Sequence, residues 1–146
     1  MRWLAPAAAA ALSACAHDAA SGFSAKERAM VDLQKGKLEA ALEELAVARR
    51  EAPADLDLAR SVVEANAKLG RLDPLIAQLD AEKAHPTAIT WYMLGLAHFA
   101  RTADAEPAAS DFRRALELSP QAAEIHYRLG VALLESEHYE QALPPL

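Results

Sequence analysis

The chain repeats a short pattern at a regular interval. The segment 35–38 (KGKL) recurs at 69–72 (LGRL), so that its glycine moves from position 36 to position 70. Prolines at positions 53, 86 and 120 follow nearly the same interval. The two glycines are 34 positions apart. A period of about this length indicates one supersecondary unit per repeat, and such a unit buries its apolar face only by stacking on its neighbours.

The composition favours helices as the content of each unit. Hydrophobic residues make up 53% of the 146 residues, much of that share is alanine, and aromatic residues make up only 5%. Alanine is the strongest helix former and adds little core volume. Ala41, Leu42, Leu45 and Ala48 follow helical spacing and place an apolar stripe on one face. The length suits one domain of closely packed helices with a hydrophobic core.

Two segments in the second half of the chain match each other closely. Residues 91–99 (WYMLGLAHF) and 126–134 (HYRLGVALL) align with their glycines at positions 95 and 130. Together with the period, this pattern resembles the tetratricopeptide repeat (TPR), a helix–turn–helix unit. The resemblance implies an all-α fold, a right-handed solenoid of helix–turn–helix hairpins. Each proline marks the boundary of a unit because proline cannot continue a helix interior.

The resemblance divides residues 23–146 into four units. They are about 23–54, 55–87, 88–121 and 122–146, and the last one is incomplete. The residues of the third unit that match the pattern are Trp91, Leu94, Gly95, Ala108, Phe112, Ala115 and Pro120. His98 departs from it, because an aromatic residue is usual there. Residues 142–146 are predicted to open a second helix in the fourth unit, so either more chain follows or a partner covers the exposed face.

Residues 1–14 have the order of a secretory signal. Arg2 is basic, residues 3–12 are apolar, and Ser13 and Ala14 are small. The apolar run is too short to span a bilayer, which takes about 20 residues. Leu12-Ser13-Ala14-Cys15 resembles the lipobox of bacterial lipoproteins. That resemblance implies removal of residues 1–14, lipidation of the Cys15 thiol, and a flexible tether over residues 15–22.

Cys15 is the only cysteine of the chain, so it makes no internal disulfide. Two acyl chains anchor a protein stably, whereas one does so only marginally. The alternatives are a signal cleaved elsewhere that leaves a free thiol, and a buried cysteine in a helix. In bacterial lipoproteins an aspartate directly after the lipidated cysteine implies retention at the inner membrane. This position is Ala16 here, so the resemblance favours the outer membrane. We therefore expect a lipid-anchored protein of the bacterial cell envelope that faces the periplasm.

The sequence gives no indication of catalysis or of nucleic-acid binding. The net charge is −6, and no basic stripe is present. The five histidines show no spacing typical of metal ligands, and no nucleophile motif or glycine-rich phosphate loop occurs. The carboxylate pairs 43–44 and 135/137 are typical of a solvated helix face. We expect no enzymatic activity, no cofactor, no metal and no small-molecule substrate.

In TPR proteins the first helices of successive units line a groove that holds a peptide or a helix. By phase, the resemblance implies a partner groove made of ten residues: Arg60, Glu64, Lys68, Tyr92, Leu96, Phe99, Tyr127, Arg128, Val131 and Leu134. In the first unit Lys26, Met30 and Leu33 occupy equivalent positions within the repeat. Aromatic residues are common anchors of partner binding. Leu96 and Leu134 have an alternative role, which is packing between units.

These features favour a membrane-anchored scaffold or assembly factor that binds partner proteins of the cell envelope. The alternative from another class is an N-terminal recruiting module of a larger envelope enzyme, for example a peptidase, whose catalytic domain lies beyond residue 146. A third interpretation is a cytoplasmic repeat adaptor whose first residues only resemble a signal. An unprocessed N-terminus would favour this third interpretation.

Overall fold

The computed structural model describes residues 22–102 and 105–136. The signal segment, Cys15 and residues 142–146 lie outside the described residues, and so do the predictions made for them. The described helices are α2 (Ala25–Gln34), α3 (Leu38–Glu51), α4 (Leu56–Lys68), α5 (Leu72–Ala81), the short 3₁₀ helix η1 (Glu82–Ala84), α6 (Ala88–Thr102), α7 (Ala105–Leu118) and α8 (Ala123–Glu135). This part of the chain contains no β-strand.

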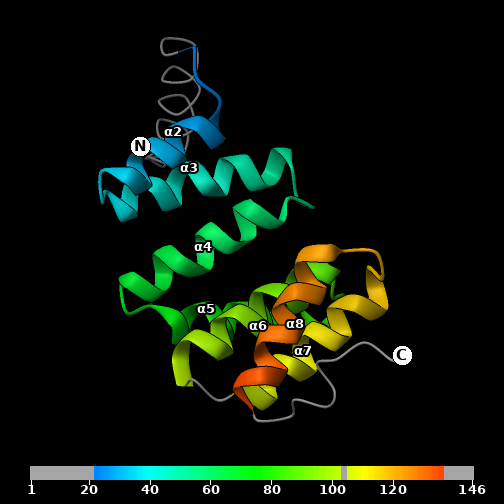
Figure 1. The fold of residues 1–146 in the computed structure, drawn as a ribbon. Helices are drawn as coiled ribbons and strands as arrows, with labels where there is room; N and C mark the ends of the chain where they lie inside the picture. Colours follow the sequence, from blue (N-terminus) through cyan, green and yellow to red (C-terminus); the bar gives the residue numbers. More distant parts are fainter. Residues whose placement is uncertain (1–21, 103–104, 137–146) are drawn as a thin grey trace, which may run out of the picture.

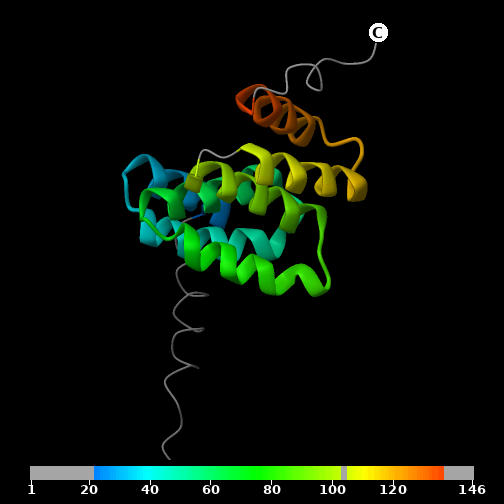
Figure 2. The ribbon, with the colours of Figure 1, turned by 90° about the horizontal axis from the view of Figure 1, so that it is seen from below.

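The helices form a stacked array in which each one packs on its neighbours in the chain. Helix α2 packs against α3, α3 against α4, α6 against α7, and α7 against α8. Helix α4 also packs against α6, so first helices of consecutive units touch directly. Figure 1 shows α2, α3 and α4 following one another through the molecule, and Figure 2 shows α8 at the far edge beyond α7. The predicted all-α array of helical hairpins is confirmed.

Helices α2 and α4 end in the same way, at the two glycines of the repeated segment. Gly36 has φ = 71° and Gly70 has φ = 68°, a left-handed conformation that a residue with a Cβ adopts only with strain. The amide of Lys37 donates to the carbonyl of Asp32 at 2.8 Å, and the amide of Arg71 donates to that of Asn66 at the same distance. These are Schellman bonds, which satisfy carbonyls at the helix end and reverse the chain into the next helix.

Small residues let the helices of one hairpin approach closely. A Cβ placed on Gly95 of α6 would lie 2.6 Å from Cε1 of Phe112 of α7, which is closer than carbon atoms approach. The Phe112 side chain therefore occupies the space that a larger residue at position 95 would need. Ala108 and Ala115 of α7 are also completely buried. Small residues on both helices therefore allow close packing within this hairpin.

Helix α2 begins at a capping box and buries few of its residues. Ser24 and Glu27 form a capping box, in which the Ser24 hydroxyl accepts from the Glu27 amide and the Glu27 carboxylate accepts from the Ser24 amide. In α2 only Ala25 and Ala29 are fully buried, whereas α4 buries six residues. No helix in the described part of the chain is both long and apolar enough to cross a membrane.

Candidate functional site: the surface of the first helices

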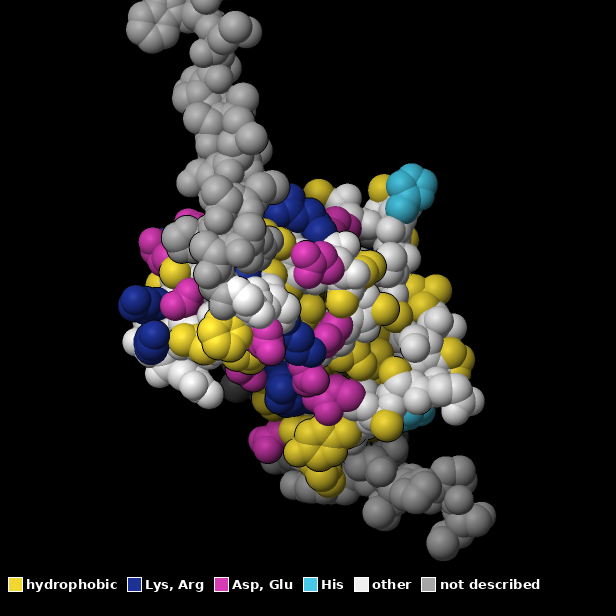
Figure 3. Space-filling view, turned by 90° about the horizontal axis from the view of Figure 1, so that it is seen from above, with side chains coloured by type: hydrophobic (Ala, Val, Ile, Leu, Met, Phe, Trp, Pro, Cys, Tyr) yellow, Lys and Arg dark blue, Asp and Glu magenta, His cyan; other side chains and the backbone are white. Residues whose placement is uncertain are grey.

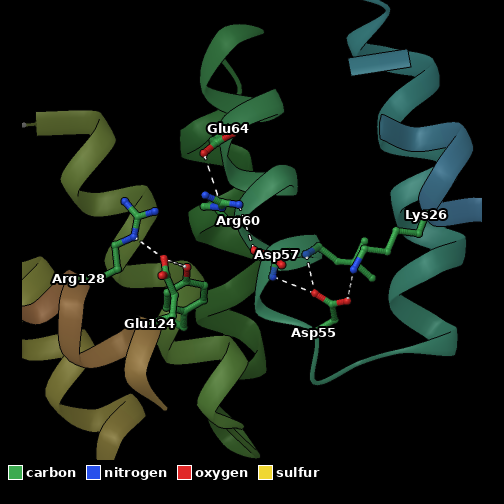
Figure 4. Close-up of polar contacts among 9 residues, drawn as sticks. Lys26, Asp55, Asp57, Arg60, Glu64, Glu124 and Arg128 are labelled. Carbon is green, nitrogen blue, oxygen red and sulfur yellow. Dashed lines mark hydrogen bonds and ion pairs between the residues drawn. The ribbon is translucent and has the colours of Figure 1, made fainter. Parts of the chain in front are cut away.

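The first helices of the units carry a strip of charged and aromatic side chains along one side. We call it the first-helix surface and define it by Lys26, Asp55, Asp57, Arg60, Glu64, Tyr92, Glu124, Tyr127 and Arg128. Figure 4 labels seven of these residues, which extend from α2 across α4 to α8. The strip therefore draws residues from all four units.

The strip begins with an ion pair between the first and second units. Nζ of Lys26 donates to Oδ2 of Asp55 at 2.7 Å. Asp55 is also the N-cap of α4, and its other carboxylate oxygen accepts from the amides of Asp57 and Leu58. The hydrogen bond from Lys26 is the main cause that lowers the pKa of Asp55, and the bond to Asp55 raises the pKa of Lys26. The carboxylate thus caps one helix while it holds a neighbouring helix.

The middle of the strip is exposed and consists of charges on α4. Arg60 lies 3.1 Å from Asp57 and 4.0 Å from Glu64, both measured from guanidinium nitrogen to carboxylate oxygen. The side chains of Asp57 and Glu64 are 67% and 60% exposed. Pairs this exposed contribute little to stability because water and salt screen them. Arg60 can therefore exchange its intramolecular partners for those of a bound protein at small cost.

The far end of the strip is a hydrogen-bonded cluster that joins the third and fourth units. The hydroxyl of Tyr92 donates to Oε1 of Glu124 at 3.3 Å, and Nε of Arg128 donates to the same oxygen at 2.8 Å. Burial raises the pKa of Tyr92 to about 12, and the negative charge of Glu124 adds to this effect. Burial acts to lower the pKa of Arg128, but the hydrogen bond to Glu124 and the charge of that carboxylate together outweigh burial and raise it. The guanidinium of Arg128 also lies 5.7 Å from the ring of Tyr127.

The predicted groove residues differ widely in how accessible the structure leaves them. Four are exposed: Glu64, Lys68, Tyr127 and Leu134. Five are half-buried: Arg60, Leu96, Phe99, Arg128 and Val131. Of the two predicted tyrosines, only Tyr127 offers its ring to a partner, since it is 62% exposed.

Tyr92 does not fit the prediction of an accessible groove residue. It is fully buried, and its ring packs 6.1 Å from that of Phe112. Phe112 belongs to the second helix of the same unit, and the Tyr92 hydroxyl donates to Glu124 of the next unit, so residues of both units cover this side chain. The position of a residue within its repeat gives the direction of its side chain, but coverage depends on the residues that pack around it.

Three acidic members of the strip, Asp55, Asp57 and Glu124, were missed by the prediction from sequence. The sequence did contain one signal for them, because the three basic residues of the strip occupy equivalent positions in their repeats. Arg60 follows Lys26 by one period, and Arg128 follows Arg60 by two periods. Each of these basic residues pairs with a carboxylate of the strip. A carboxylate is therefore found beside each of the three equivalent positions.

The charges of the strip do not separate into regions of one sign. Figure 3 shows basic and acidic side chains interspersed with apolar ones on the face of the molecule seen from above. Of the charged residues in the definition, three are basic and four are acidic. Such a surface does not attract strongly anionic or cationic ligands over a distance. Among the described residues, no group of three or more His, Cys, Asp or Glu side chains is placed to hold a metal ion.

A second polar contact lies between the helices of the third hairpin, away from the strip. Nδ1 of His98 in α6 lies 2.6 Å from Oδ2 of Asp111 in α7. Both side chains are largely buried, with 18% and 11% exposed. Burial raises the pKa of Asp111, although the hydrogen bond and charge of His98 and the charge of Lys83 act against it. This pair replaces the aromatic contact that the repeat pattern usually provides at position 98.

Comparisons with known proteins agree with this architecture. The family model described as tetratricopeptide repeat matches residues 88–121, which contain α6 and α7. Among solved structures, the chain is similar to the first TPR domain of the human RPAP3 protein, with a TM-score of 0.54 and 20% identity. That similarity covers 82% of this chain and 95% of the other and concerns the fold. The comparison with curated protein sequences gave no match.

Proposed function

We propose that this chain is a protein-binding module that a lipid on Cys15 anchors in the bacterial cell envelope. The observation that carries the binding role is the first-helix surface, which presents accessible side chains from the first, second and fourth units on one side. A protein or peptide partner that lies along several units would contact them together. The TPR match at residues 88–121 supports this role, since the family is known for protein–protein interaction.

The first-helix surface offers two kinds of contact to such a partner. Charges on α4 are exposed and only weakly held, so they provide polar contacts that can be exchanged. Tyr127 provides an exposed aromatic ring at the other end, stacked near a guanidinium. Aromatic side chains, tyrosine among them, are common hot spots of protein interfaces and contribute a large share of the binding free energy. We therefore assign Tyr127 as the main anchor and Arg60 with Glu64 as polar contacts.

The binding role is tested with the full chain carrying Cys15→Ser as bait against a detergent extract of the producing cell's envelope, with quantitative mass spectrometry. We expect Tyr127→Ala to reduce recovery of the retained proteins at least tenfold, because an aromatic hot spot contributes about 2 kcal/mol or more. The matched control is Leu118→Ala, which removes a comparably exposed apolar side chain from α7. Equal recovery with Tyr127→Ala and Leu118→Ala, at unchanged melting temperature, would contradict the assignment.

The proposed lipid anchor is inferred from the sequence segment Leu12-Ser13-Ala14-Cys15 and is tested separately. The intact mass of the native protein, purified from membranes, should equal that of a chain starting at Cys15 plus acyl groups. We expect Cys15→Ala to move the protein out of the membrane fraction without changing its helical content. A native protein that starts at Met1 and carries no lipid would contradict the envelope location. A much heavier lipidated product would instead support the recruiting module of a larger enzyme.

A further inference from the structure

A tryptophan with two basic side chains beside it lies where η1, α6 and α7 meet. Trp91 of α6 is half-buried, because it packs against the hydrophobic core and stays partly accessible. Nζ of Lys83 in η1 lies 5.4 Å from the centroid of its ring, and Cζ of Arg114 in α7 lies 5.2 Å from it. Both distances are typical of cation–π contacts. We call these three residues the tryptophan cluster, and none of them belongs to the first-helix surface.

Arg114 is the member of the tryptophan cluster whose hydrogen-bond donors are available. It is exposed, and no carboxylate of the described residues forms an ion pair with it. A guanidinium that lies over an aromatic ring makes this contact with its flat face, so the N–H groups at its edge remain free to donate. The contact with the ring also restricts a long side chain, which lowers the entropy cost of binding a ligand. Arg114 is therefore a preorganised donor for an anion.

Lys83 has a carboxylate partner, but the pair is exposed. Its Nζ lies 2.7 Å from Oδ1 of Asp80, and the side chains of Lys83 and Asp80 are 40% and 47% exposed. Exposed pairs of this kind contribute little to stability, so the ammonium group can turn to another anion at small cost. Because Lys83 and Arg114 lie beside the same ring, an anion bound next to Trp91 interacts with both positive charges.

The surroundings of the cluster favour a singly charged ligand over a highly charged one. Asp111 lies near enough to Lys83 and Asp80 for their charges to affect its pKa, so two carboxylates are close to the cluster. The chain as a whole carries a net charge of −6, which repels polyanions and anionic membranes. A carboxylate adds one negative charge, and its two oxygens match the paired donors of a guanidinium.

From these contacts we propose that the tryptophan cluster binds an acidic side chain of a protein partner. The aspartate or glutamate carboxylate of the partner accepts two hydrogen bonds from Arg114, and Lys83 supplies a second positive charge. Trp91 holds the guanidinium in place and is covered when the partner binds. The cluster shares no residue with the first-helix surface, so the proposal is independent of the proposed function.

The proposal is tested by the fluorescence of Trp91 in the full chain with Cys15→Ser and Trp3→Phe, which leaves Trp91 as the sole tryptophan. The probe is an acetylated and amidated peptide with two glutamates and no aromatic residue, and the comparison peptide has glutamines instead. We expect a signal change with the glutamate peptide only. Arg114→Gln should raise its dissociation constant roughly fivefold or more, because a charge-assisted bidentate contact is lost. The matched control, Arg113→Gln, removes the same charge from the neighbouring position and should have an effect below about twofold.

A second variant separates the shape of the guanidinium from its charge. Arg114→Lys keeps the charge but not the paired donors, so it should also weaken binding of the glutamate peptide. Circular dichroism shows whether each variant is folded. Equal effects of Arg114→Gln and Arg113→Gln, or no response of Trp91 to the glutamate peptide, would overturn the proposal. An equal response to inorganic phosphate would mean an unselective anion contact, and a response to phosphatidylglycerol vesicles alone would mean a membrane contact; either result would also overturn it.

Discussion

His98 and Asp111 show how one substitution in the repeat pattern changes the physics of a hairpin. An aromatic ring at position 98 would add apolar burial, whereas the histidine brings a carboxylate into the interior with it. Burial of a carboxylate is costly unless the group is hydrogen-bonded, and here His98 provides the bond. Lys83 of η1 and Asp80 of α5 face the same carboxylate with opposite charges. The net result is a raised pKa of Asp111.

This pair predicts a pH dependence of stability with a definite sign. The pKa of Asp111 is raised in the folded state, so the folded state holds this proton more tightly than the unfolded state. The contribution of Asp111 to the free energy of unfolding therefore falls as the pH rises through the folded-state pKa. Asp111→Asn keeps a hydrogen-bonding side chain but cannot ionise. We therefore expect the stability of the wild type relative to this variant to decrease from pH 4 towards pH 7 in urea unfolding. A relative stability that increases over the same range would contradict the prediction. Asp111→Ala, which leaves His98 without its bond, should be less stable than Asp111→Asn at every pH.

Two helices of this fold end at glycine residues. Gly36 and Gly70 close α2 and α4 with the same pair of Schellman bonds. Gly95 has a different role, since it makes room for Phe112 in the middle of a helix. Glycine therefore serves two purposes in this chain, and its position relative to the helix end distinguishes them. The prolines at 53, 86 and 120 complete the pattern by lying between helices.

The glycine caps give a prediction in which backbone strain acts alone. A Cβ on Gly36 would meet nothing within 4 Å in the described structure, so Gly36→Ala adds no steric clash and costs only the left-handed conformation. We expect a loss of about 1 kcal/mol in the free energy of unfolding. Gly36→Asn should lose less, because asparagine tolerates this conformation better. Lys35→Ala, one residue earlier, is the matched control. Equal stabilities of the alanine and asparagine variants would show that backbone strain is not the cause.

At the scale of the molecule, the array is held by contacts between neighbours. Inter-unit contacts include the Lys26–Asp55 pair, the Tyr92–Glu124 bond and the direct packing of α4 on α6. In a quasi-one-dimensional fold, damage in one unit weakens nearby units more than distant ones.

Local coupling of this kind predicts where a core mutation acts. Phe112 is 2% exposed and packs on Gly95 and Tyr92, so Phe112→Ala should cost about 3–5 kcal/mol. Hydrogen exchange should accelerate most in α6 and α7 and least in α2 and α3. Leu45→Ala, at a fully buried site in α3, is the reciprocal control and should act mainly on the first units. A uniform acceleration in both variants would mean that the array unfolds as a single cooperative block.

Local features of this protein followed directly from the sequence. The repeat period, the helical spacing of apolar side chains and the boundary prolines predicted an array of helical hairpins, and the structure confirms that architecture. This prediction succeeded because its causes lie within a few residues or recur at a fixed interval: the missing amide of proline and the helical spacing of apolar side chains.

Which side chains stay accessible was decided only by the tertiary structure. Tyr92 and Tyr127 occupy the same position in the repeat, yet one is completely buried and the other is 62% exposed. Tyr92 is covered from two units, since its ring packs against Phe112 of α7 and its hydroxyl donates to Glu124 of α8. The ion pair of Lys26 with Asp55 likewise joins residues from two different units. Burial and pairing of this kind depend on which helices stack together, and a side chain's position within its own repeat does not contain that information.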